Sequence, residues 1–309
     1  MTFTATIAAK DARFGKNLFD STLDKPNGKS VTQNGWLTIN LRVFLNFVDP
    51  PGGGLKNVVT EGGKTYALDY DNWMFPMLPW SANAKRDFCD AFNKAAWLWN
   101  YKFVLKTPRN YTGMDITNYD NPVIFGNKIR PNVICLFRMA LVANNGGWHR
   151  KINIFNLDRS ATTVKKYKTT QTKTVGTLDS FTFRSDAENY DSYDTIIPAT
   201  PVGSFHDSVC GCTVIIKHNT IAHELGHAIG QPHIAGLQGD ATCSLESRTQ
   251  GAAKCYASSP GNVMGSGDQI WPINAYSWQQ RIAEHTGTTA NDWWAVMDDS
   301  LPPQLIAIP

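Results

Sequence analysis

The sequence has no long hydrophobic run and little net charge. No stretch approaches the roughly 18 apolar residues that a membrane-spanning helix requires. The first ten residues, Met1–Lys10, contain no basic segment followed by an apolar core, so no secretory signal peptide is predicted there. A formal net charge of +3 over 309 residues gives no basis for predicting a nucleic-acid partner or a membrane surface. We therefore expect the partners to be determined by one particular site.

Cysteine is also sparse, with six residues in the chain. Cys243 and Cys255 bracket a short polar segment, where a disulfide would stabilise the loop between them. For Cys210 and Cys212 three alternatives stay open: disulfides to distant cysteines, reduced thiols, or a thiolate close to a metal. The even number of cysteines favours an oxidising compartment as the destination of the protein.

Three of the seven histidines lie in one eleven-residue segment from His223 to His233. On an α-helix, residues i and i+4 share a face about 5–6 Å apart at Cβ, so His223 and His227 can bind one metal ion. Gly230 can adopt the left-handed conformation that ends a helix, and the chain then returns His233 as a third ligand. Such a pattern arises by chance in about one sequence in 10⁵ of this length. The segment predicts a Zn²⁺ site.

Glu224 follows the first of these ligands. It is placed to face a metal-bound water and not the metal itself, and there it can act as a general base. Zinc lowers the pKa of a bound water from about 15.7 to roughly 7 and polarises a scissile carbonyl. The remaining histidines stand apart in the sequence, and we expect surface or hydrogen-bonded core positions for them; they are His149, His206, His218 and His285.

A methionine in a glycine-flanked turn, Met264 within Gly261–Gly267, follows 31 residues after His233. With the histidine motif, this segment resembles the metzincin clan of zinc peptidases. The resemblance implies that Met264 forms a hydrophobic floor beneath the zinc; an ordinary buried methionine is the alternative. Ser266 stands where several metzincin families carry a tyrosine, and Ile234 matches none of the common families, so only the clan is assigned. The candidates for the missing tyrosine's role are Tyr256, Tyr276 and His206.

The rest of the chain predicts an α+β domain. Residues 37–48 are rich in β-formers and precede a Pro/Gly loop at 49–54. Residues 81–100 have helical periodicity and place Phe88, Phe92, Ala95 and Trp99 on one side. Further strands are predicted at 101–106, 133–142 and 151–157, and a further helix at 274–285. The Thr- and Lys-rich segment 159–177 is interpreted as a solvated hairpin or loop, in preference to a basic binding patch.

Three parts are predicted along the chain. Residues 1–34 are polar and punctuated by glycine and proline, as in an extension lying on the surface. Residues 35–230 would form the N-terminal catalytic subdomain with the zinc helix, and residues 231–309 a C-terminal subdomain with the third ligand and the Met-turn. The resemblance implies a twisted mixed β-sheet carrying a long helix and the zinc helix. It also implies a smaller, mostly irregular C-terminal part ending in a helix.

The predicted function is that of a zinc-dependent endopeptidase acting on protein or peptide substrates, with Glu224 as general base. The alternative from another class is a zinc-stabilised binding or toxin module without turnover. Glu224 speaks against it, since a structural tetrahedral site uses a fourth protein ligand. We expect a bacterial exported protease or injected effector, or a secreted protease; a cytoplasmic location is also compatible. The sequence does not predict the oligomeric state.

Overall fold

The fold is described from a computed structural model of the chain. It describes residues 4–10, 17–24, 35–107, 123–124, 127–128, 132–158, 160–175, 183, 185, 188–195, 203–207, 212–238, 261–265 and 267–297. The fold is α+β, with a mixed sheet and few helices, which confirms the predicted class. Within the described residues, no helix is long and apolar enough to cross a membrane.

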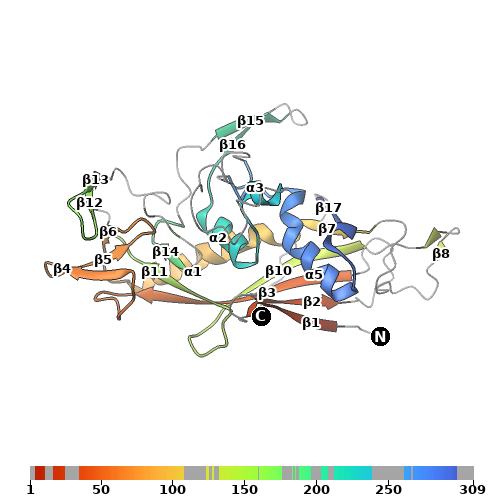
Figure 1. The fold of residues 1–309 in the computed structure, drawn as a ribbon, viewed down its shortest axis with the longest axis horizontal. Coiled ribbons are helices and arrows are strands. Elements are labelled where there is room, and N and C mark those ends of the chain that lie inside the picture. The colour runs from red at the N-terminus through yellow and green to blue at the C-terminus, as the bar shows by residue number, and fades with distance from the viewer. Residues whose placement is uncertain are drawn as a thin grey trace.

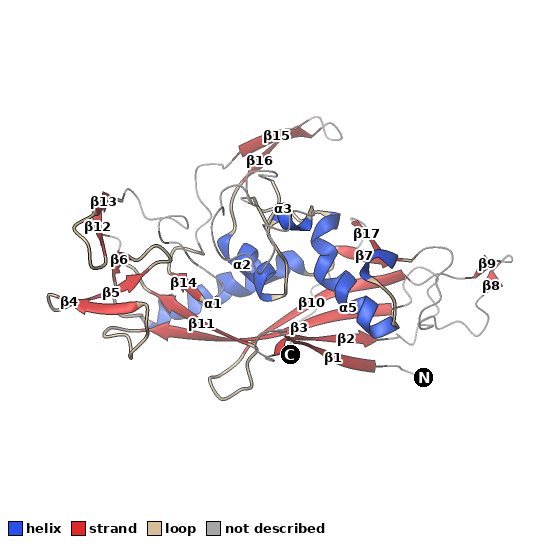
Figure 2. Cartoon of the chain, in the orientation of Figure 1, coloured by secondary structure: helices blue, strands red, loops and turns tan. Residues whose placement is uncertain are grey.

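A mixed sheet forms one layer of the molecule, and the helices lie on one face of it (Figures 1 and 2). Its strands follow the order β1 (Thr4–Lys10), β2 (Asn17–Asp24), β3 (Gly35–Val48), β10 (Asn132–Leu141), β7 (Phe103–Lys106) and β17 (Trp294–Met297). Strand β11 (Arg150–Phe155) pairs with the second half of β3, and β14 (Asn189–Asp191) pairs with β11. Strands β10 and β11 are parallel to β3, whereas β2 is antiparallel to it.

Strand β3 lies at the centre of this sheet. Its apolar residues recur at every second position. Successive side chains of a strand point to opposite faces, so a period of two buries one face. The residues on the buried face are Leu37, Ile39, Leu41 and Val43, while Asn40 and Arg42 lie partly exposed on the other. The buried face of β3 therefore belongs to the core beneath the helices.

Helix α1 (Ala82–Ala96) continues as a 3₁₀ turn over Trp97–Trp99. Its N-cap is Ser81, whose hydroxyl accepts the Ala84 backbone N–H. The predicted inward face is confirmed, since Phe88, Phe92, Ala95 and Trp99 are all buried. The other main helices are α2 (Thr220–Ala228) and α5 (Tyr276–Thr286). The Trp99 indole N–H donates to the Ala222 carbonyl at 2.9 Å and so links α1 to α2.

A second, smaller sheet has its own hydrophobic core. It contains β4 (Val58–Glu61), β5 (Lys64–Leu68), β6 (Trp73–Pro76), β12 (Thr163–Lys166) and β13 (Thr172–Thr174). Strands β12 and β13 form an antiparallel hairpin, in agreement with the hairpin predicted for 159–177. The remaining short elements are β8 (Val123–Ile124), β9 (Asn127–Lys128), β15 (Gly203–Asp207), β16 (Cys212–Ile216), α3 (Ile234–Leu237) and 3₁₀ turns at Pro272–Ala275 and Ala290–Asp292.

The N-terminal segment differs from the surface extension predicted for residues 1–34. Strands β1 and β2 pair with each other, and β2 pairs with β3, so both belong to the main sheet. Phe19, Ser21 and Leu23 are buried at alternate positions of β2. The polar composition of the segment outweighed this short period of two in the sequence analysis, and the domain boundary at residue 34 stays a prediction.

In the C-terminal part, helix α5 corresponds to the helix predicted at 274–285, and the described residues continue beyond it. Gly287, in the left-handed conformation (φ 69°), ends α5, and the chain then returns to the main sheet as β17 beside β7. Strand β17 has only four residues, which are too few for a period of two to predict it from the sequence. One hydrophobic core contains Ile229 as well as Val263 and Trp278, which lie on either side of the predicted subdomain boundary at residue 230. That boundary stays a prediction.

Candidate metal centre

Helix α2 presents the histidines of the motif as predicted. Its N-cap is Asn219, whose side-chain oxygen accepts the Ala222 backbone N–H at 3.0 Å. His223 and His227 are therefore one helical turn apart on the same face. Gly230 has φ 89°, the left-handed conformation expected at the exit of the helix. The chain turns there and brings His233 back toward α2.

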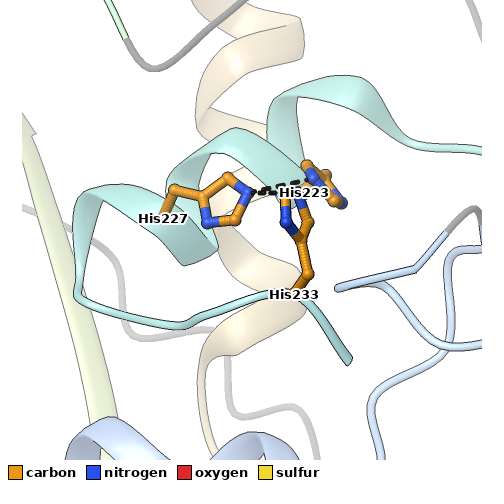
Figure 3. A group of neighbouring side chains, drawn as sticks. All are labelled: His223, His227 and His233. Carbon is orange, nitrogen blue, oxygen red and sulfur yellow. Dashed lines mark hydrogen bonds between the residues drawn. The ribbon is translucent and has the colours of Figure 1, made fainter. Parts of the chain in front are cut away.

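The three imidazoles converge on one point (Figure 3). The Nε2 atom of His227 lies 3.1 Å from Nε2 of His223 and 3.1 Å from Nε2 of His233. All three ligand atoms lie within 4.8 Å of one another, so the group could hold a metal ion. Glu224 does not belong to this group. It is buried beside His223 on α2, with 9% of its surface exposed, which is compatible with a role other than that of a ligand.

Backbone carbonyls hold two of the rings in one orientation. His223 Nδ1 lies 2.7 Å from the Val263 oxygen, and His227 Nδ1 lies 2.7 Å from the Gln231 oxygen. A carbonyl oxygen only accepts, so each Nδ1 donates and each neutral ring carries its lone pair on Nε2. Two such lone pairs facing each other at 3.1 Å need a proton or a cation between them.

Protonation does not supply that positive charge at neutral pH. Burial lowers the pKa of His227 to about 4. Burial, and then the proximity of His227, lowers the pKa of His233 to about 3. The pKa of His223 is also well below its usual value, chiefly because of burial. The lowered pKa values favour neutral rings at pH 7, and three neutral imidazoles that converge in this way could hold a metal ion.

The donor set and its spacing fit zinc. Two nitrogen ligands of a tetrahedral zinc, each about 2.0–2.1 Å from the metal, are about 3.3 Å apart, close to the separation of the two Nε2 pairs. Imidazole also suits copper, iron and nickel, so the donors define a class of metals. Three protein ligands leave a fourth position for water, as in catalytic zinc sites.

Met264 packs directly against helix α2. A Cβ atom placed on Gly226 would lie 2.3 Å from the Met264 sulfur and 2.8 Å from Cζ2 of Trp99. Met264 is fully buried, so only a glycine between the two histidines of α2 permits this approach. The hydrophobic floor beneath the zinc that the metzincin resemblance implies for Met264 stays a prediction.

The turn around Met264 is held by buried amide side chains. Asn262 Oδ1 accepts the Met264 backbone N–H at 2.8 Å, and the Asn262 amide donates to Asn274 Oδ1 at 2.8 Å. The Met264 carbonyl accepts the N–H of Ile234, the residue after the third histidine, at 2.9 Å. Since Val263 in the same turn accepts from a ligand ring, the turn contacts both ends of the motif.

Several other predicted residues are not brought to this site. Tyr276 begins α5 with 37% of its surface exposed, and no contact among the described residues places it beside the histidines. Outside the described residues lie Cys210, Cys243, Cys255, Tyr256 and Ser266, together with the side chains of His206 and Cys212. The predicted disulfide and the missing tyrosine's replacement therefore stay predictions. Cys89 and Cys135 are free thiols.

His218 is a neighbour of the site that sequence reasoning missed. Its ring centroid lies 5.8 Å from that of His223, and its side chain is buried. His218 precedes the N-cap Asn219 and lies outside the helix, so helical spacing gave no signal for it. Recognition of Asn219 as an N-cap would have placed this histidine at the start of the metal-binding helix.

Comparison of the chain with known protein families, with curated proteins and with solved structures found no match. The metzincin resemblance therefore depends on the histidine motif and the Met264 turn.

Proposed function

We propose that this chain is a zinc-dependent endopeptidase of the metzincin type, acting on protein or peptide substrates. The observation that carries the proposal is the convergence of three Nε2 atoms, two of them on rings whose Nδ1 atoms are bonded to backbone carbonyls. The packing of Met264 against Gly226 supports it, because the same turn lies beneath the helix and orients His223.

The residues divide the chemistry between them. Zinc held by the three histidines would supply an activated water and polarise the scissile carbonyl. Glu224, buried next to His223, would accept the proton of the attacking water and return it to the leaving amine. The carbonyls of Val263 and Gln231 would keep the rings oriented, as partners of metal-ligating histidines do in other sites. Burial strengthens each of these electrostatic interactions.

The decisive experiment measures metal content and cleavage on the same samples. The parent, Glu224→Gln and Glu61→Gln are compared for zinc per chain by elemental analysis and for cleavage of a panel of denatured proteins. Glu224→Gln should keep about one zinc per chain and lose at least 10²-fold in cleavage rate, because it retains the shape of glutamate without the base. Glu61 is an exposed residue paired with Lys165, and its variant should match the parent.

Two results would contradict the proposal. If the Glu224→Gln variant keeps both zinc and cleavage, Glu224 is not the general base. A parent that binds zinc stoichiometrically and cleaves nothing in the panel would favour the zinc-stabilised binding module.

Export from the producing cell is part of the same proposal. A chain fused to a reporter should appear outside the producer under at least one export condition. Retention of the fusion in the producer under every condition would contradict export and leave the enzymatic proposal untouched.

A further inference from the structure

Buried amide side chains join the two segments whose carbonyls orient the helical histidines. One segment is the turn at Val263, whose carbonyl accepts from His223, and the other contains Gln231, whose carbonyl accepts from His227. A buried amide is stable only when its polar atoms are hydrogen-bonded, so its partners show which parts of the chain it holds together. The amide side chains concerned are fully buried, and they are Gln231, Asn262 and Asn274.

Asn262 fixes the direction of the Val263 carbonyl. This carbonyl and the Met264 N–H belong to one peptide group, and a planar trans peptide points the two bonds in opposite directions. Asn262 Oδ1 accepts the Met264 N–H at 2.8 Å. With the N–H held on that side, the carbonyl is directed to the other side, where His223 Nδ1 donates to it at 2.7 Å.

The Gln231 carbonyl cannot be fixed in the same way, because the next residue is Pro232 and its nitrogen carries no hydrogen. Gln231 is anchored through its other donors instead. Its backbone N–H donates to the Gly226 carbonyl at 2.8 Å, and its side-chain amide donates to the Asn274 backbone carbonyl at 2.8 Å. These two bonds hold the residue whose carbonyl accepts from His227.

Asn274 contacts both segments. Its side-chain oxygen accepts from the Asn262 amide at 2.8 Å, and its own amide donates back to Asn262 Oδ1 at 3.1 Å. Its backbone carbonyl accepts from the Gln231 amide. The Trp271 N–H donates to the same side-chain oxygen at 2.8 Å, which holds Asn274 in the 3₁₀ turn at Pro272–Ala275. One buried residue thus connects the supports of both ligand rings.

We propose that Asn274 is a positioning residue for the metal centre, because it holds in place both carbonyls that orient His223 and His227. Displacement of Asn274 would release Asn262 on one side and Gln231 on the other, so both rings would lose their fixed direction together. Groups that orient metal-ligating histidines commonly contribute about 10–100-fold to metal affinity. The inference rests on the proposed function only in that these histidines bind a metal.

Two substitutions interrupt this network with little change of shape. Asn274→Asp keeps the size of the side chain and replaces the amide that donates to Asn262 with a second acceptor oxygen. Gln231→Met keeps the length of the side chain and removes the donor to the Asn274 carbonyl. The matched control is Asn46→Asp, which removes the donor of another amide pair, from Asn46 to Asn153 at 2.8 Å, between β3 and β11 of the main sheet.

The direct readout is the exchange of the imidazole Nδ1–H protons with water. It is followed by NMR at pH 7 on chelator-treated protein labelled with ¹⁵N-histidine. In the parent, His223 and His227 should both carry a slowly exchanging proton on Nδ1. Asn274→Asp and Gln231→Met should each speed exchange at both rings by about tenfold, the effect of losing one buried hydrogen bond. Asn46→Asp should leave both rings as in the parent.

Zinc dissociation constants, measured by competition with a chelator, test the consequence for the metal. Asn274→Asp and Gln231→Met should bind zinc about 10–100-fold more weakly than the parent, and Asn46→Asp should bind it equally well. If Asn274→Asp does not fold, Gln231→Met decides the outcome, because its effect reaches His223 only through Asn274.

Three results would overturn the proposal. Faster exchange at His227 alone in Gln231→Met would show that the two carbonyls are held independently. Unchanged zinc affinity in the network variants would show that the metal does not depend on this support. Equal acceleration in Asn46→Asp would identify general loosening of the fold as the cause. No readout depends on cleavage, so a chain that binds zinc and cleaves nothing would contradict the peptidase proposal and leave this inference intact.

Discussion

Gly226, on α2, has no room for a side chain larger than a hydrogen atom, because Met264 packs closely against it. The residue lies between the two helical histidines, where Trp99 and Met264 approach from the core. Glycine in a helix costs about 1 kcal/mol relative to alanine. The close approach of the Met-turn offsets this cost, since the turn also provides the carbonyl that orients His223.

Gly226→Ala should therefore destabilise the protein in spite of the better helix propensity of alanine. Inserting a methyl group into a well-packed core typically costs about 1–3 kcal/mol, so after the gain of about 1 kcal/mol in helix propensity we expect a net loss of up to about 2 kcal/mol together with weaker zinc binding. Urea unfolding and a zinc titration measure the two effects.

A double-mutant cycle supplies the control. In a Met264→Ala background the contact at 2.3 Å is removed and only the one with Trp99 at 2.8 Å remains, so the cost of Gly226→Ala should shrink. An equal cost in both backgrounds would show that Met264 is not the obstacle.

At the scale of elements, the contact between β2 and α5 anchors the N-terminal strands. Ser21 Oγ lies 3.0 Å from Nε2 of His285, and the Arg281 guanidinium Nε–H donates to the same hydroxyl at 3.2 Å. All three side chains are buried. Burial, and then the positive charge of Arg281, lowers the pKa of His285 to about 4.

This contact should make stability depend on pH. With a folded pKa of about 4 and an unfolded pKa of about 6.5, His285 binds protons first in the unfolded chain. Its stabilising contribution is complete above pH 6.5 and is lost as the pH falls toward 4. In His285→Gln we expect a smaller loss of unfolding free energy between pH 7.5 and pH 4, by about 2 kcal/mol after allowance for solvent screening.

Urea unfolding of the parent and the variant, both with a chelator present, measures this difference. The chelator makes the contribution of the metal ligands equal in the two proteins. Parallel pH dependence in both would show that His285 is not the group responsible.

The elements with strong local patterns could be predicted, and the others could not. Strand β3 carries a clear period of two, the helix that begins after Ser81 carries a period of 3.6, and β10 is a long apolar run. Strands β2 and β17 are stabilised mainly by pairing with distant segments, so their own sequences carry weak signals. These two strands were not predicted for this reason.

At the scale of the whole molecule, the metal centre joins segments far apart in the sequence. His223 and His227 lie on α2, His233 follows the turn at Gly230, and the Met264 turn contacts both. A metal at this point would bind the folded chain and not the unfolded one, so its binding free energy would add to stability.

Zinc should therefore raise the thermal midpoint. At a free zinc concentration 100 times the dissociation constant, the gain is about 2.7 kcal/mol, which corresponds to a rise of roughly 5 °C for a chain of this size. Differential scanning calorimetry of chelator-treated protein, with and without added zinc, measures the shift. In His233→Ala the shift should fall by more than half, and an undiminished shift there would mean that zinc acts at another site.

The local sequence by itself determined the core of the metal centre. Within eleven residues, helix periodicity and a left-handed glycine decide that His223, His227 and His233 face one point, because these are short-range backbone properties. Only the tertiary structure decided what surrounds them: the carbonyl of Val263 on His223, Met264 against Gly226, and His218 beside the first ligand. Such contacts depend on packing between segments that lie tens to more than a hundred residues apart, and no local pattern encodes that packing.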